Sequence, residues 1–231
     1  MTTTSQTVLS QLYEDIVVGT FSFGAKLGEE QLVERYGTKR HVLRQAFSHL
    51  EELSFIERIP NRGVFVREPH PKEVADLFEI RQLLETHAIK LMVLPAPVAI
   101  IENMREIQSR HSAATRAAQY REVLHLNTEF HRAQYAHCGN AALAAAIEDY
   151  AMRTHPITAM KFGNPDLMEN VITQHEGIID AMSGSDQGAL VDQIRAHFDL
   201  ARIDRYREQF DLRHGADSNG AKIRPRHRFV L

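Results

Sequence analysis

From residue 72 to about residue 210, the sequence carries a single kind of hydrophobic pattern, and that pattern is helical. Apolar residues recur every three or four positions, which is the spacing of the buried face of an α-helix. Breaks rich in proline, glycine and serine fall at residues 95–97, 139–140, 163–165 and 183–185. The pattern predicts an antiparallel all-helical bundle built from helices over residues 72–93, 98–118, 120–138, 140–160, 166–182 and 187–210.

The first 68 residues have a different pattern. Helical spacing predicts short helices over residues 8–19, 29–36 and 39–53. Two β-prone runs, residues 55–59 and 64–66, follow on either side of a Pro-Asn-Arg-Gly turn, which predicts a β-hairpin. Three short helices followed by a hairpin form a winged helix-turn-helix.

The fold class is therefore mainly α, with two domains joined by a linker at Pro69 and Pro71. Residues 1–68 are the expected winged helix-turn-helix, and residues 72–210 are the expected helical bundle. Residues 211–231 are polar and basic, which predicts a disordered tail.

The net charge of −3 conceals a basic segment, residues 38–50, that contains no acid. Its basic residues lie off the apolar stripe of the third predicted helix and so face outward, where a recognition helix reads base edges. An arginine there can bridge guanine O6 and N7, and a residue at the wing tip can reach a phosphate or the minor groove. The alternative is an ordinary solvated helix face. The candidate DNA contacts are Lys39, Arg40, His41, Arg44, Arg62 and Gly63.

Polar residues interrupt the apolar stripes of several bundle helices. Asn127 and His131, four residues apart, share one helix face, while His175 and His197 lie in the stripes of two later helices. Burying all four without mutual partners would cost about 1–3 kcal/mol each, so a shared polar centre is the economical arrangement. Three imidazoles and one oxygen ligand suit a divalent metal such as zinc or nickel, whose open positions would bind an anionic effector. Two alternatives are a metal-free polar pocket and separate core histidines with local partners.

Arg81 lies in the stripe of the first bundle helix. It can hold the carboxylate of an effector, or it can pair with Glu85 one turn further along. The sequence leaves both interpretations open. His125 and Glu129 fall on the opposite face of the helix that carries Asn127, and we expect them to be solvated. His155 and His137, near helix ends, are expected to be structural.

The segment LGEEQLVERYGTKRHVLRQAFSHLEELSFIERIPNRGVFV resembles the winged helix of the GntR family, and the resemblance covers nearly all of residues 8–67. It implies DNA contacts at Arg40, Arg44, Arg62 and Gly63 and, by weaker correspondence, at Lys39 and His41. The chain departs from the pattern at residues 39–42, where Lys-Arg-His-Val replaces Ser-Arg-Thr-Pro, and also at Gly28 and Ser54. These departures bear on the operator sequence more than on the fold.

Residues 72–207 resemble the FCD domain, the effector-binding domain of FadR-like GntR regulators. The matching segments are LFEIRQLLETHAIKL, NTEFHRAQYAHCGN, QHEGIIDAM and IRAHF. The resemblance implies metal ligands at Asn127, His131, His175 and His197 and effectors that are small carboxylates. Asn127 stands where aspartate is commoner, and a neutral amide is the weaker ligand.

Taken together, these features predict a DNA-binding transcriptional regulator whose affinity for its operator is controlled by a small organic acid, with possible metal assistance. We expect a homodimer on a palindromic operator in double-stranded DNA. The weighed alternatives are a metal-dependent hydrolase and an adaptor. The pocket face offers no carboxylate base except Glu85, and an enzyme would not need the basic helix, so we expect no catalytic residues. A single cysteine, Cys138, and the lack of a signal peptide or a long apolar run predict a cytoplasmic protein that does not enter the membrane.

Overall fold

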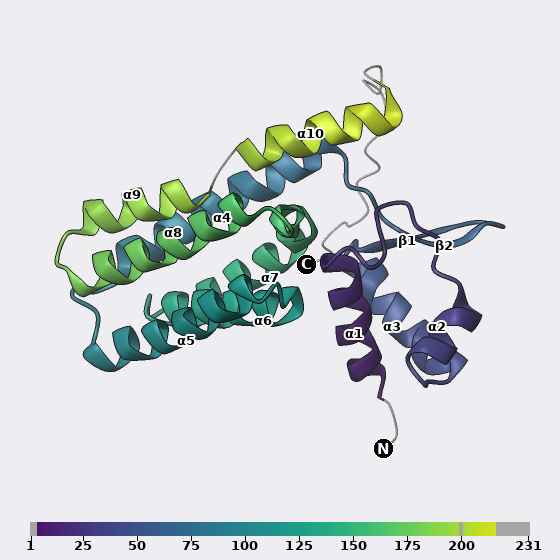
Figure 1. Cartoon of the computed structure of the whole chain (residues 1–231), viewed down its shortest axis with the longest axis horizontal. Helices are drawn as coiled ribbons and strands as arrows, with labels where there is room; N and C mark the ends of the chain where they lie inside the picture. Colours follow the sequence, from purple (N-terminus) through teal and green to yellow (C-terminus); the bar gives the residue numbers. More distant parts are fainter. Residues whose placement is uncertain (1–3, 199–200, 216–231) are drawn as a thin grey trace, which may run out of the picture.

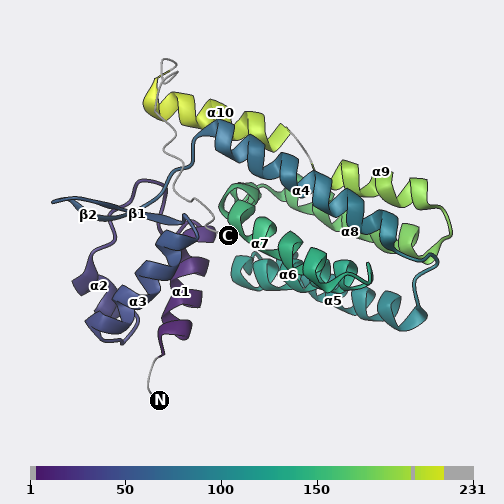
Figure 2. The same ribbon diagram turned by 180° about the vertical axis from the view of Figure 1, so that it is seen from behind.

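The computed structural model describes residues 4–198 and 201–215 and has two lobes (Figures 1 and 2). The N-terminal lobe contains three helices and a two-stranded antiparallel hairpin, and the second lobe is a helical bundle. The predicted fold class is thereby confirmed. No helix within the described ranges has the length and apolar character needed to cross a membrane.

The N-terminal lobe is a winged helix-turn-helix. Its core is formed by side chains with almost no exposure, among them Leu12, Phe47 and Ile56. The strands pair Ile56 with Val66 and end at a turn in which Gly63 has a φ of +112° that a β-carbon would strain. Its elements, in chain order, are α1 (Ser5–Val17), α2 (Glu29–Arg35), α3 (Arg40–Glu52), β1 (Ile56–Ile59) and β2 (Gly63–Val66).

The bundle helices begin where the sequence supplies capping groups. Pro71 occupies the first turn of its helix, and the side chains of Asn140, Asn164 and Asp186 accept backbone N–H groups at three later helix starts. The helices are α4 (Pro71–Leu91), α5 (Val98–Arg116), α6 (Tyr120–Ala136), α7 (Ala141–Thr158), α8 (Pro165–Ser183), α9 (Gln187–His197) and α10 (Ala201–His214), with a short 3₁₀ helix, η1 (Ala159–Lys161), after α7.

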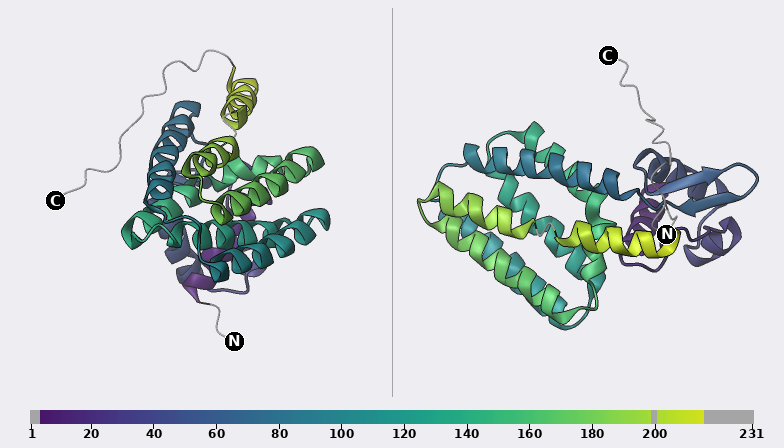
Figure 3. Two further views of the ribbon diagram at one scale, coloured as in Figure 1. Left: turned by 90° about the vertical axis from the view of Figure 1, so that its left-hand side faces the viewer. Right: turned by 90° about the horizontal axis from the view of Figure 1, so that it is seen from above.

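The C-terminal part of the bundle differs from the prediction. Instead of one helix over residues 187–210, the structure has α9 and α10, and the backbone of Phe198 closes α9. Helix α10 continues to His214, so the first four residues of the expected disordered tail are helical. Glu68 accepts hydrogen bonds from Arg213 at 2.8 Å and from His214 at 2.9 Å, which holds this end of α10 against the linker (Figure 3). Residues 216–231 of the expected tail lie outside the described residues.

The two lobes are joined through α1. Asp15, which is buried, accepts hydrogen bonds from Tyr36 at 2.7 Å and Arg35 at 3.1 Å, and its other oxygen pairs with Arg121 of α6. The Tyr13 hydroxyl shares a hydrogen bond with His155 of α7. Helix α1 is therefore bonded to α2 on one side and to the bundle on the other.

Candidate functional site

The predicted DNA contacts all lie at exposed positions of the winged lobe. Lys39 is the N-terminal cap of α3, and Arg40, His41 and Arg44 occupy the first turns of that helix. The hydrophobic side of α3 is buried against the lobe, which turns these basic groups toward solvent. Arg62 and Gly63 lie at the tip of the hairpin, as predicted for a wing.

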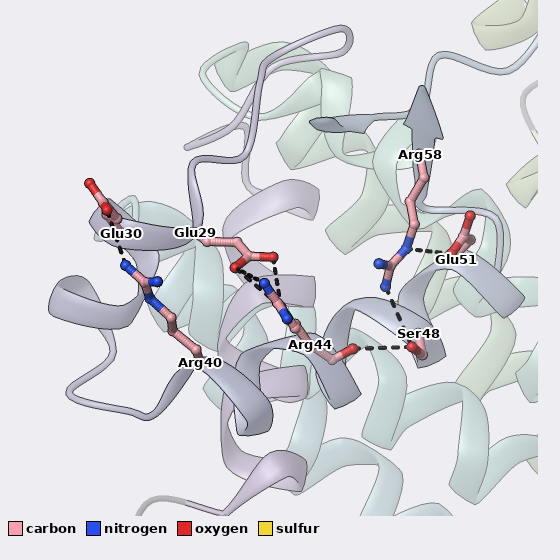
Figure 4. A network of polar contacts seen from close by, with 7 residues as sticks. All are labelled: Glu29, Glu30, Arg40, Arg44, Ser48, Glu51 and Arg58. Carbon is pink, nitrogen blue, oxygen red and sulfur yellow. Dashed lines mark hydrogen bonds and ion pairs between the residues drawn. The ribbon is translucent and has the colours of Figure 1, made fainter. Parts of the chain in front are cut away.

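The two arginines of α3 are paired with consecutive glutamates of α2 (Figure 4). Arg44 donates from Nε and Nη2 to the carboxylate of Glu29 at 3.0–3.2 Å. Arg40 donates from Nη2 alone to Glu30 Oε1 at 3.0 Å. Sequence analysis identified the arginines but not their acidic partners.

In the bundle, the structure brings together the three histidines among the four polar residues that interrupt the apolar stripes. The ring centroids of His131, His175 and His197 lie 5.0–5.2 Å apart, and ligand atoms from all three lie within 4.8 Å of one another. The closest approach joins His131 Nε2 and His197 Nε2 at 3.2 Å. Three separate helices, α6, α8 and α9, therefore converge on one interior point.

A glutamine side chain orients each of these rings. Nδ1 of His131 contacts Oε1 of Gln134 at 3.1 Å. Because an amide oxygen can only accept, this Nδ1 carries the proton and the lone pair is on Nε2. The same arrangement recurs at His175 with Gln108, at 2.8 Å, and at His197 with Gln174, at 3.0 Å.

These contacts leave lone pairs facing one another. His131 Nε2 and His197 Nε2 both lack a proton to share across their 3.2 Å separation, and the buried His175 Nε2 has no hydrogen-bond partner among the residues that the structure describes. Burial lowers the pKa of His131 to about 4 and holds the pKa values of His175 and His197 well below the usual range, so all three are neutral at pH 7.

This donor set fits a divalent cation. Two imidazole nitrogens that bind one zinc ion at about 2.0–2.1 Å lie about 3.0–3.4 Å apart, close to the separation of His131 and His197. A metal-bound histidine characteristically donates its other ring N–H to a carbonyl or carboxylate oxygen, as all three rings do here.

A cavity of about 1080 Å³ opens beside the histidines. Four of the five predicted effector contacts line it: Arg81, Asn127, His131 and His197. The fifth, His175, lies in the histidine cluster but does not line the cavity. The cavity is slightly larger than the common range for small-molecule pockets, about 300–1,000 Å³.

Arg81 makes the internal ion pair that the sequence offered as the alternative to effector binding. Its Nε lies 2.9 Å from Glu85 Oε1, and its Nη1 donates to Thr154 Oγ1 at 2.8 Å. Tyr135 donates to the second oxygen of Glu85 at 2.6 Å, so both carboxylate oxygens are engaged. Arg81 nevertheless lines the cavity and adds a positive charge to its wall.

One wall of the cavity belongs to the winged lobe, through residues of α1 that include Tyr13 and Glu14. Sequence analysis missed this wall because the contacts join segments more than 100 residues apart. His155, expected to be structural, is buried, lines the cavity and bonds to Tyr13. His125, expected to be solvated, is 58% exposed as predicted, and it also pairs with Glu14 Oε1 of α1 at 3.2 Å.

Sequence analysis also missed three other ionisable groups near the histidine cluster. Lys161 and Arg202 line the cavity, and both contribute to the lowered pKa values of His131 and His197. A further buried imidazole, His111, lies 5.0 Å from His175 between ring centroids. Lys161 lies in η1, and Arg202 lies in α10 beyond the predicted metal ligands, so neither falls in an interrupted apolar stripe.

Two regions of the chain match known families. Residues 4–66 match bacterial regulatory proteins of the gntR family, and residues 76–200 match the FCD domain. The HTH-type transcriptional regulator YdhC of Bacillus subtilis, itself described as uncharacterized, is 23% identical over 82% of this chain and 85% of its own length. A probable D-xylose utilization operon transcriptional repressor of Paenarthrobacter nicotinovorans is 27% identical over 79% and 82% of the two chains.

Known structures give the same fold. E. coli McbR/YncC has a TM-score of 0.75 at 19% identity and covers 91% of this chain and all of its own. A putative GntR regulator from Rhodococcus has a TM-score of 0.71 at 19% identity, covering 87% and 96%. With the two family matches spanning most of the chain in the order that the two lobes take, the protein belongs to the GntR family of bacterial DNA-binding transcriptional regulators and carries an FCD domain.

Proposed function

We propose that this regulator binds its operator through Lys39, Arg40, His41 and Arg44, at the start of α3, and through Arg62 and Gly63 of the wing. An effector bound in the bundle cavity changes the affinity of the protein for the operator. One observation carries the proposal: the cavity lined by His131 and His197 is also lined by α1 of the DNA-binding lobe. A ligand that fills this cavity contacts both lobes.

The effector that suits the cavity is a small organic acid. Arg81, Lys161 and Arg202 line it and supply positive charge, while Asn127 supplies a neutral amide. In a cavity partly shielded from water, a carboxylate gains more from such groups than it would at the surface.

A divalent metal, zinc or nickel, would be held by His131, His175 and His197, with Asn127 as a weak fourth ligand. When bound, the ion supplies positive charge and open coordination positions for oxygen atoms. The three glutamines keep Nε2 of each ring aimed at the shared centre. Asn127 lines the cavity beside His131, four residues earlier on α6.

The signal leaves the cavity through α6 and α7. Helix α6 carries both Asn127 and His131 on the cavity side, and Arg121, two turns before Asn127, pairs with Asp15 and Glu14 of α1. Asp15 in turn bonds to the C-terminal end of α2. An effector can shift this arrangement only by its difference in affinity for the two orientations of the lobes.

The regulator acts as a homodimer in the cytoplasm. Each chain presents one recognition helix, and two copies can place theirs about one DNA turn apart on a palindrome. Leu83 on α4 and Val93 just after it are 69% and 75% exposed, which offers apolar surface for a second copy.

The operator contact is tested with Arg44→Ala. The operator is first selected from random duplex DNA with the wild-type protein, and binding is then compared in a gel shift at moderate salt. The variant should lose specific binding while its circular dichroism spectrum stays unchanged, since Arg44 is exposed. Retained specific binding by a folded Arg44→Ala protein would overturn the contact.

The metal is tested by elemental analysis of protein purified without chelators, alongside Asn127→Asp and His131→Ala. We expect the Asp variant to retain more zinc or nickel than the wild type, because a carboxylate is the stronger ligand, and the Ala variant to retain none. Equal metal in wild type and His131→Ala would contradict the site. The alternative function, a metal-dependent hydrolase, would need Glu85 as its general base, but both carboxylate oxygens of Glu85 already accept hydrogen bonds. Hydrolysis of an ester by the purified protein would favour this alternative.

A further inference from the structure

Two neighbouring glutamates at the start of α2 hold the arginines of α3 in different ways (Figure 4). Glu29 binds Arg44 through both carboxylate oxygens, and it engages Nε and Nη2, the inner edge of the guanidinium. Glu30 binds Arg40 through one oxygen, on Nη2 alone, a nitrogen that the inner and outer edges of the guanidinium share. The side chain of Glu29 is 31% exposed, whereas that of Glu30 is 85% exposed.

The chemistry of the guanidinium gives these two contacts different consequences. Arginine has five N–H donors in a rigid plane. Glu29 uses one donor on Nε and one on Nη2 of Arg44, so both hydrogens of Nη1 and the outer hydrogen of Nη2 remain. This outer edge is one that can donate to guanine O6 and N7 together. Glu29 thus fixes the plane of Arg44 without covering the edge that reads a base.

Arg40 is held less firmly than Arg44. Its partner contacts Nη2 alone, so a phosphate or base that binds this nitrogen competes with Glu30. The pair has a single hydrogen bond and is largely exposed to solvent, and such pairs are weak and readily exchanged. The Glu30 carboxylate also adds a negative charge at a surface that approaches the DNA phosphates.

We propose that the two glutamates act on DNA binding with opposite signs: Glu29 is a positioning residue that aims Arg44 at a base, and Glu30 is a competitor that lowers affinity by occupying Arg40. The inference rests on the proposed contacts of Arg40 and Arg44 with DNA. It assigns base discrimination to the Glu29–Arg44 pair and a sequence-independent weakening to Glu30.

The test compares Glu29→Gln with Glu30→Gln, using the selected operator and an unrelated duplex in fluorescence anisotropy titrations over a range of salt. Both variants remove one negative charge from the first turn of the same helix, so their effects on the stability of α2 are matched. Glu30→Gln should bind both duplexes about two- to fivefold more tightly, as expected for release of one exposed ion pair. Glu29→Gln should instead lower the operator-to-unrelated affinity ratio by about fivefold or more.

A readout of base preference separates positioning from mere structural support. The affinity of each protein is measured for operators in which one guanine at a time is replaced. At one of these positions, replacing the guanine should cost the wild-type protein more affinity than it costs Arg44→Ala or Glu29→Ala. Glu29→Gln, which keeps one acceptor for Arg44, should restore part of this discrimination. If Glu29→Gln tightens binding to both duplexes as Glu30→Gln does, the glutamates act only as charges and the inference is overturned.

Two further variants show where a failure lies. If Arg40→Ala and Arg44→Ala bind the operator like the wild type, the proposed DNA contacts themselves are wrong. If those variants lose binding while both glutamate variants match the wild type, only the roles of Glu29 and Glu30 are refuted.

Discussion

The polar clusters of the two lobes are held in opposite ways. Arg40 and Arg44 of the winged lobe are exposed and paired with acids. His131, His175 and His197 of the bundle lie in the interior, are neutral at pH 7 and are paired with glutamine amides. In each lobe, a neighbouring side chain orients the group that would meet the ligand.

The difference between the partners shows what each cluster can bind. A carboxylate partner leaves an arginine charged, and a phosphate can take its place, so the arginine cluster is suited to exchange one anion for another. An amide partner orients an imidazole but brings no charge. The lone pairs of the histidines therefore remain available to a cation, and an anion could enter only beside that cation or beside the arginines and lysine of the cavity.

The largest expected effect is a loss of bundle stability in acid. Burial lowers the pKa of His111 to about 4 and that of His155 to about 3. In the unfolded chain both titrate near about 6.5, so below that pH the unfolded state binds more protons and stability falls as pH falls. Between pH 7 and pH 5, each buried histidine should remove about 2 kcal/mol from the free energy of unfolding, measured by urea titration of metal-free protein.

His111→Leu and His49→Ala provide the comparison between lobes. His111 lies in the bundle and is 1% exposed, whereas His49 lies on the exposed side of α3. The drop in stability between pH 7 and pH 5 should shrink by about 2 kcal/mol in His111→Leu and stay unchanged in His49→Ala. Equal drops in all three proteins would show that His111 is not held neutral by burial.

A smaller effect is expected when one glutamine is removed from the histidine cluster. Gln174→Leu deletes the acceptor that orients His197, and loss of such a partner typically lowers metal affinity by about 10- to 100-fold. Zinc affinity is measured by competition with a chelating dye. The control is Gln209→Leu, at an exposed position of α10, and similar affinities in the two variants would show that Gln174 does not tune the site.

The positions of both clusters could be predicted from sequence, because each is visible as a break in a local pattern. Basic residues opposite the apolar stripe of α3 must face outward, and a histidine inside an apolar stripe must face inward. For Arg81, helical spacing allowed an ion pair with Glu85 or a free guanidinium, and only the observed contacts with Glu85 and Thr154 decide between them.

The partners of the clusters could not be predicted in the same way. Gln108 and Gln174 approach histidines through the packing of α5 on α8 and of α8 on α9, and glutamine is ordinary at any helix position. The pairing of Tyr13 with His155 joins two lobes across 142 positions of sequence. Local periodicity contains no information on which faces of two lobes will meet, so the contribution of α1 to the cavity wall could not be predicted from the sequence.

The smallest expected effect concerns that wall. Tyr13→Phe removes one buried hydrogen bond, worth about 1 kcal/mol, without touching a predicted DNA contact or metal ligand. Its energy is measured by a double-mutant cycle with His155→Leu in urea unfolding, in which a direct contact should give a coupling of about 1 kcal/mol. The single variants should leave zinc content and operator affinity in the absence of effector unchanged.

The outcome decides how the lobes communicate. His155 lines the cavity and Tyr13 lies on α1, so a measurable coupling would mean that the cavity wall and the DNA-binding lobe share stability. Stabilities that add within about 0.3 kcal/mol would make the contact energetically incidental. The contacts of Arg121 with Glu14 and Asp15, which are charged and therefore sensitive to salt, would then be the stronger candidates for the link, and raising the salt concentration should weaken the response to effector.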